Sequence, residues 1–87
     1  MRGRDLLAWN LRRLRSERGQ SQERLAADTG IDRAYLSELE RGQGNATLDI
    51  IDRLATHLDV GPAELLAAQD PASPVPENLK PGRKARV

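Results

Sequence analysis

The chain has 87 residues, no cysteine and one histidine, so it suits one small domain and excludes a disulfide framework and cysteine-rich or multi-histidine metal sites. No apolar run approaches the length of a membrane span and no signal-peptide pattern opens the chain, so we expect a cytoplasmic protein. The net charge of +1 is unevenly distributed: residues 1–33 carry +3, residues 34–69 carry −4 and residues 70–87 carry +2. An arginine-bearing end that meets phosphate and an acidic end that faces away are expected.

The spacing of apolar residues predicts an all-α fold. They recur at helical intervals over about residues 5–18, 22–29, 33–41 and 48–58, and Gly61-Pro62 opens a short fifth helix. Three of these helices have an N-cap residue before them, and a glycine stops the first: Ser21, Asp32, Thr47 and Gly19. We therefore expect a compact five-helix domain over residues 1–69.

The expected core is aliphatic, because the chain has no phenylalanine and its only aromatic residues are Trp9 and Tyr35. The apolar positions assigned to it are Leu7, Leu11, Leu14, Leu25, Ala26, Ile31, Leu36, Leu39, Leu48, Ile51, Leu54, Ala55 and Leu58. Trp9 and Ile50 lie beside the main stripes, where they either complete the core or belong to an interface. The sequence shows no strand pattern and no internal repeat.

Residues 22–41 have the pattern of two helices joined by a tight turn. Ala26 is small where the two helices must cross closely, and Gly30 can adopt the positive φ that a sharp turn needs. This pattern is typical of a helix-turn-helix, whose second helix commonly lies in the DNA major groove. The alternative is a helical hairpin with a purely structural role.

Several short motifs resemble the lambda-repressor and Cro-like (Xre-like) family of DNA-binding domains. They are Leu11-Arg12-x-x-Arg15, Gly19, Ser21-Gln22-x-x-Leu25-Ala26, Gly30, Leu36-Ser37-x-Leu39-Glu40-Arg41-Gly42 and Leu54-Ala55-x-x-Leu58. A narrower similarity, to the controller proteins of restriction–modification systems, rests on Asp32-Arg33-x-Tyr35-x-Ser37, Glu40-Arg41 and Asn45-x-Thr47. The resemblance covers roughly residues 5–68 and implies that an Arg15–Glu40 pair ties the first helix to the third. Gln20 and Ala46 depart from the family, which often has a large apolar residue and a proline there.

The start of the third helix carries the candidates for reading DNA bases. Arg33 can bond O6 and N7 of guanine together, which discriminates by about 1–3 kcal/mol. Ala34, Ser37 and Glu38 share its exposed face and suit a thymine methyl group, a base or phosphate, and cytosine N4 respectively. The alternative for Arg33 is a contact with a DNA phosphate. The alternative for Glu38 is to orient Arg33 or Arg41.

A second set of residues is expected to contact DNA phosphates: Ser21, Gln22, Tyr35, Arg41, Asn45 and Thr47. Ser21 and Gln22 begin the second helix, where free N–H groups favour an anion, and the resemblance implies a phosphate contact for Gln22. The hydroxyl of Tyr35 could bond phosphate while its ring covers a sugar. Ordinary turn and cap chemistry is the alternative for Asn45 and Thr47.

The resemblance further implies a homodimer on a double-stranded DNA operator, because one such domain contacts too few base pairs for useful specificity. The expected dimer interface comprises Val60, Pro62, Ala63, Leu66 and Ala67. Residues 70–87 form a proline-rich basic tail that we expect to be disordered or extended. No cofactor or small-molecule effector is evident and no catalytic constellation is visible. A protein-interaction module, such as an antitoxin or anti-regulator, is the alternative function.

Overall fold

The computed structural model describes residues 2–68, and within them the chain forms five helices and no strand. The helices are α1 (Gly3–Glu17), α2 (Gln22–Thr29), α3 (Arg33–Glu40), α4 (Leu48–Leu58) and α5 (Pro62–Leu65). The predicted all-α, five-helix architecture is therefore confirmed. α1 begins two residues earlier than expected, and α1 and α3 each end one residue earlier. The predicted tail at 70–87 lies outside the described residues.

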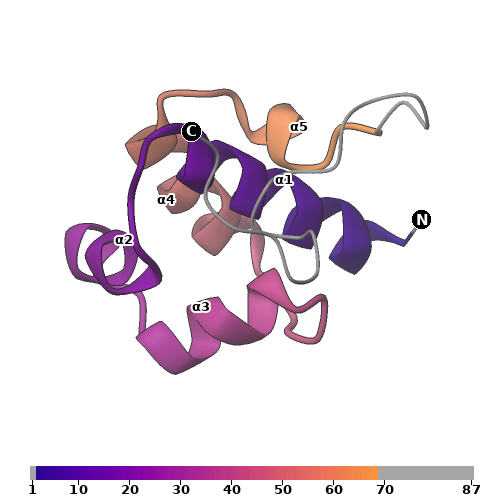
Figure 1. The fold of residues 1–87 in the computed structure, drawn as a ribbon. Helices are drawn as coiled ribbons and strands as arrows, with labels where there is room; N and C mark the ends of the chain where they lie inside the picture. The colour runs from indigo at the N-terminus through magenta and orange to yellow at the C-terminus, as the bar shows by residue number, and fades with distance from the viewer. Residues whose placement is uncertain (1, 69–87) are drawn as a thin grey trace, which may run out of the picture.

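The five helices are arranged around α1, which crosses the middle of the molecule (Figure 1). α1 contacts α3 and α5, α2 contacts α3 and α4, and α4 contacts α5. The α2–α3 pair thus lies on one side of α1, while α5 covers another side of it. This placement leaves the outer face of α3 away from the rest of the domain.

The helix starts are capped as the sequence predicts. Ser21, Asp32 and Thr47 each accept, with a side-chain oxygen, a hydrogen bond from the backbone N–H three residues on, at 3.0–3.1 Å. Such a cap stabilises a helix by about 1 kcal/mol relative to alanine. Because these bonds join residues three apart, the residue types alone indicate where α2, α3 and α4 begin.

The turn between α2 and α3 depends on Gly30. Its φ of 74° lies in the left-handed region, and its N–H donates to the carbonyl of Ala26 at 2.9 Å, which ends α2. Ile31 then enters the core directly after the turn. A residue with a Cβ would be strained at this φ, so the glycine sets the angle between the two helices.

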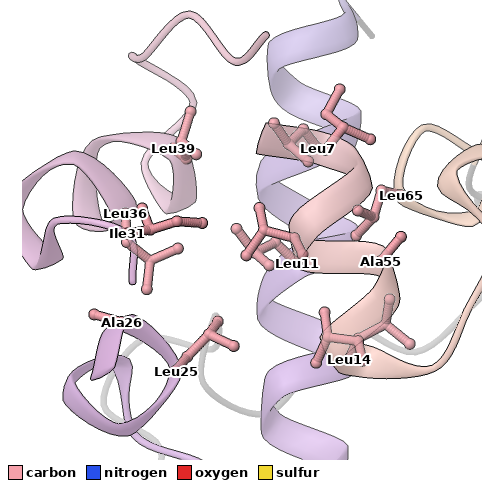
Figure 2. Packing of buried hydrophobic residues seen from close by; sticks show 13 residues of the cluster. Leu7, Leu11, Leu14, Leu25, Ala26, Ile31, Leu36, Leu39, Ala55 and Leu65 are labelled. Carbon is pink, nitrogen blue, oxygen red and sulfur yellow. The ribbon is translucent and has the colours of Figure 1, made fainter. Parts of the chain in front are cut away.

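Thirteen buried apolar side chains form one core between the helices (Figure 2). They are Leu7, Leu11, Leu14, Leu25, Ala26, Ile31, Leu36, Leu39, Ile51, Leu54, Ala55, Leu58 and Leu65. Ile50 packs against this core while half-buried. The prediction for Leu48 is wrong, because its side chain is 76% exposed. Helical side chains lean toward the preceding turn, and Leu48 is the first residue of α4, so it leans beyond the helix.

Candidate nucleic-acid interface

The two faces of α3 differ sharply in burial. Leu36 and Leu39 face the core at 0% and 1% exposure, whereas Arg33, Ala34 and Glu38 are exposed. Ser37 is half-buried on the outward side. The four candidate base-reading residues therefore share one accessible helix face, as their spacing requires. Their individual roles toward DNA stay predictions.

Arg33 lies at the junction between the starts of α2 and α3. One guanidinium nitrogen donates to the side-chain oxygen of Gln22 at 3.5 Å and lies 4.0 Å from a carboxylate oxygen of Glu23. The side chain nevertheless remains 54% exposed. These two acceptors on α2 orient the guanidinium while leaving it accessible from solvent, which suits a group that binds an external acceptor.

Beside it, a buried carboxylate joins three helices. Glu40 is 1% exposed, and its two oxygens accept hydrogen bonds from Nε and Nη2 of Arg15 at 2.6 and 2.9 Å. The same carboxylate accepts a third bond from Nε2 of Gln22 at 2.9 Å. Arg15, Gln22 and Glu40 are called the Glu40 network below. The Arg15–Glu40 pair that the resemblance implies is thus present, with the forked geometry that arginine and carboxylate favour.

Gln22 has a structural function that the sequence analysis missed. Its amide nitrogen is held by Glu40 and its amide oxygen faces Arg33, so it connects the buried network to the exposed guanidinium. The amide nitrogen has two N–H groups and Glu40 accepts from one of them, so a phosphate contact by this side chain would use the second N–H. Its backbone N–H, in the first turn of α2, lacks an intrahelical partner by geometry and remains suited to an anion. No local sequence signal reveals a bond across eighteen residues.

The loop between α3 and α4 is attached to its neighbours at Asn45. The hydroxyl of Tyr35 donates to the backbone carbonyl of Asn45, and Arg4 donates to the Asn45 side-chain oxygen. Gly44 is also buried against Leu39, where an added Cβ would approach a leucine methyl carbon to 2.9 Å. Tyr35 thus uses its only hydroxyl proton within the protein, and its predicted phosphate contact would require that bond to open.

The end of α3 carries the candidate phosphate ligand Arg41. Its Nη1 donates to the hydroxyl oxygen of Ser37 at 2.6 Å, and its Nε donates to the side-chain oxygen of Gln43 at 3.4 Å. The Ser37 hydroxyl accepts this bond and keeps its own proton for an external acceptor. Arg41 is exposed, so its guanidinium extends the outward face of α3 toward the α3–α4 loop.

The amino-acid sequence matches a known protein family. The profile of a helix-turn-helix domain matches residues 6–68, which include most of α1 and all of the other four helices. The chain belongs to the helix-turn-helix family. Among the residues that the structure describes, no helix combines the length and apolarity needed to cross a membrane.

Relatives in this family include regulatory proteins from several bacteria. A hypothetical transcription factor from Neisseria meningitidis serogroup B is 43% identical over 63 residues, which are 72% of this chain and 59% of that protein. Its solved structure has a TM-score of 0.73 and 41% identity, with 76% of each chain covered. Control protein C.BamHI of Bacillus amyloliquefaciens is 39% identical over 70% of this chain and 76% of that protein.

The solved structure of a restriction–modification controller protein is also similar to this chain. C.AhdI from Aeromonas hydrophila has a TM-score of 0.68 and 47% identity over 71% of this chain and 94% of that one. The resemblance to Xre-like regulators and to controller proteins is therefore confirmed. Membership of this family supports DNA binding by the chain, since these relatives are described as transcription factors or control proteins.

On the opposite side of α1, this helix-turn-helix domain presents the candidate dimer surface. Pro62, Ala63, Leu66 and Ala67 are exposed and Val60 is half-buried. Leu66 is 39% exposed, whereas its neighbour Leu65 is fully buried in the core, so one leucine anchors α5 and the other faces solvent. The exposed set is compact in sequence and mostly apolar, as a self-complementary contact requires.

Asn10 holds this surface in place, and the sequence analysis overlooked it. Its fully buried side chain donates from Nδ2 to the backbone carbonyls of Leu65 at 3.1 Å and Ala67 at 3.0 Å. A buried amide hydrogen-bonded in this way fixes the end of α5 against α1. The available signal was a polar residue three positions after Leu7 and four before Leu14, within the apolar face of α1.

Proposed function

We propose that the chain is a sequence-specific DNA-binding transcriptional regulator, which acts as a homodimer on a (pseudo)palindromic operator with α3 in the major groove. The observation that carries this proposal is the exposed face of α3, where Arg33, Ala34, Ser37 and Glu38 stand opposite the buried Leu36 and Leu39. Proteins that read bases in the major groove commonly use a helix that packs on the domain with one face and exposes the other face to DNA.

The supports of α3 favour the same function. The Glu40 network fixes the end of α3 against α1 and the start of α2, and the bond from Tyr35 fixes the loop that follows. A recognition helix needs this rigidity, because base contacts discriminate only when donors and acceptors are held in register. Arg33, with its guanidinium over the helix start, is the residue that we assign to guanine.

Two copies are needed for useful specificity. One domain of this size reads only a few base pairs, and a symmetric dimer reads two half-sites about one helical turn apart. The exposed surface of Val60, Pro62, Ala63, Leu66 and Ala67 is our candidate for the two-fold contact. Its position away from α3 leaves both recognition helices accessible.

Selection of bound sequences from random duplex DNA tests the proposal. We expect an enriched site made of two inverted half-sites, with centres separated by about 10–10.5 base pairs or a multiple of this spacing. Arg33→Ala should lose one enriched base pair in each half-site, and Arg13→Ala on α1 serves as a charge-matched control away from α3. Enrichment without inverted symmetry would contradict the dimer.

A salt titration separates DNA binding from the alternative of a protein-interaction module. Affinity for the selected duplex should fall linearly with salt on logarithmic axes, with a slope set by the number of phosphates contacted. A protein that enriches no DNA sequence, and whose weak DNA binding is the same for every duplex, would contradict the proposed operator recognition.

A further inference from the structure

A hollow lies between α1 and the end of α3, beside the proposed DNA surface and separate from the base-reading residues. Its volume is about 290 Å³, close to the lower end for small-ligand sites. The lining residues are Asp5, Ala8, Trp9, Arg12, Glu40, Arg41 and Gly42. Asp5, Ala8, Trp9 and Arg12 come from one face of α1, because they are spaced by three, one and three residues.

Two of the lining residues have buried donors without acceptors. Within residues 2–68, neither the indole Nε1 of Trp9 nor the Nε of Arg12 has a hydrogen-bond partner, although both atoms are buried. Buried N–H groups are nearly always paired, because an unmade bond costs the full desolvation of the donor. Two such groups on one helix face, three residues apart, indicate that an acceptor belongs here.

The groups around the hollow attract Arg12 but leave its Nε without a hydrogen bond. Glu40 already accepts two bonds from Arg15 and one from Gln22, and its nearer oxygen lies 4.0 Å from Nε of Arg12, an ion-pair separation that is beyond hydrogen-bond distance. Burial lowers the pKa of Arg12 from its usual value, against the opposing attraction of Glu40. The carboxylate of Asp5 accepts from the backbone N–H of Arg2 at 3.3 Å and faces that side chain at 3.6 Å.

We propose that this hollow binds an oxyanion of the phosphate type, held by the guanidinium of Arg12 and the indole N–H of Trp9. Binding requires each side chain to turn its buried donor toward the hollow that it lines. The bound oxygens then accept a charge-assisted hydrogen bond from Arg12 and a hydrogen bond from the neutral indole of Trp9, so both donors gain a partner. Arg41, on the rim, adds a second positive charge.

The phosphate has two possible sources. A free phosphate-bearing molecule would make the hollow a small-molecule site, and a DNA backbone phosphate would extend the proposed interface from Arg41 onto α1. The shared chemistry is an oxyanion accepting from Trp9 and Arg12. The first source stands independently of the proposed operator binding, so the two proposals can fail separately.

Trp9 is the only tryptophan of the chain, so its indole N–H gives a single, unambiguous nitrogen–proton resonance. The full chain is titrated with sodium phosphate, and with sodium chloride at matched ionic strength. We expect the indole resonance to move saturably with phosphate and not with chloride. This measurement needs no variant, so a substitution that prevents folding leaves the test intact.

Arg12→Gln and Arg13→Gln form a matched pair of variants. Both remove one positive charge from the middle of α1, but Arg13 is bonded to Glu17 at 3.3 Å and does not line the hollow. Loss of one charge-assisted bond should weaken phosphate binding about tenfold or more for Arg12→Gln. Arg13→Gln should bind phosphate as the unaltered chain does. Circular dichroism confirms that each variant is helical.

The DNA arm uses the selected duplex in chloride buffer without phosphate ions. If the indole resonance moves with this duplex, and Arg12→Gln lowers the salt slope by about one while Arg13→Gln does not, the backbone is the source. Movement with inorganic phosphate alone identifies a free phosphate ligand. An indole resonance that moves with neither, or equal effects of the two variants, would overturn the oxyanion site.

Discussion

Replacement of Glu40 by alanine is the sharpest test of how α3 is held. Glu40 is 1% exposed and the side chain of Arg15 is 13% exposed, so the variant leaves an almost buried guanidinium without its carboxylate. Breaking a buried ion pair by removing one partner costs about 3–5 kcal/mol, more than the pair contributes, because the remaining charge stays desolvated. Gln22 also loses the acceptor of its amide at 2.9 Å.

Glu17→Ala is the matched control. Glu17 and Glu40 are each the last residue of a helix, so the change in helix propensity is similar. Glu17 pairs with Arg13 at 3.3 Å but is 58% exposed, and an exposed pair four residues apart contributes about 0.3–0.5 kcal/mol. The difference between the two variants therefore isolates the burial of the carboxylate.

Urea unfolding followed by circular dichroism measures both free energies of unfolding. For a domain of this size, a loss of 3 kcal/mol lowers the melting temperature by about 12–24 °C. The double variant Arg15→Met with Glu40→Leu removes both charges, and we expect it to be more stable than Glu40→Ala alone. Equal losses for Glu40→Ala and Glu17→Ala would refute the reasoning, because the Glu40 network would then contribute no more than a surface pair.

Two further predictions concern the proposed function and a third concerns the extent of the folded domain. Arg33→Ala should reduce affinity for the selected operator by about 1–3 kcal/mol per contact while leaving binding to scrambled duplex nearly unchanged, as a filter or mobility assay would measure; equal loss on both would make Arg33 a phosphate ligand. Leu66→Glu should convert the dimer to a helical monomer in sedimentation, with operator binding weakened far more than half-site binding, since each substitution occurs twice at a two-fold contact; a helical protein that stays dimeric moves the contact elsewhere. A chain ending at Gln69 should keep its melting temperature, because the core lies within residues 7–65, and a large fall would show that the tail packs on the domain.

The features that the sequence predicted correctly are local. The caps at Ser21, Asp32 and Thr47 act over three residues, and Gly30 acts on its own backbone, so the residue types suffice to place them. Apolar spacing predicted the core for the same reason, since each stripe lies on one helix. Leu48 failed because periodicity assigns a face but does not say where that face stops being covered.

The features that the sequence did not predict are bonds between distant residues. Gln22 binds Glu40 across eighteen residues, Tyr35 binds the Asn45 carbonyl across ten, and Asn10 binds the Leu65 carbonyl across fifty-five. A polar side chain has several partners available in a linear sequence, and only the packed helices select one. The sequence therefore favours DNA contacts for Gln22 and Tyr35, whereas the packed structure shows the intramolecular partner of each.

α1 connects the proposed reading surface to the proposed dimer surface. Asn10 bonds the end of α5, and Arg15 bonds the end of α3 through Glu40. Five residues of helix separate these anchors by about 7.5 Å along the axis and about 140° around it, so they act on different faces of one rigid element. In a symmetric dimer the contact surface sets the two-fold axis, and the orientation of α3 relative to that axis sets the distance between the two half-sites. Substitutions at these anchors should therefore change the preferred half-site spacing, whereas substitution of Arg33 changes the base that is read.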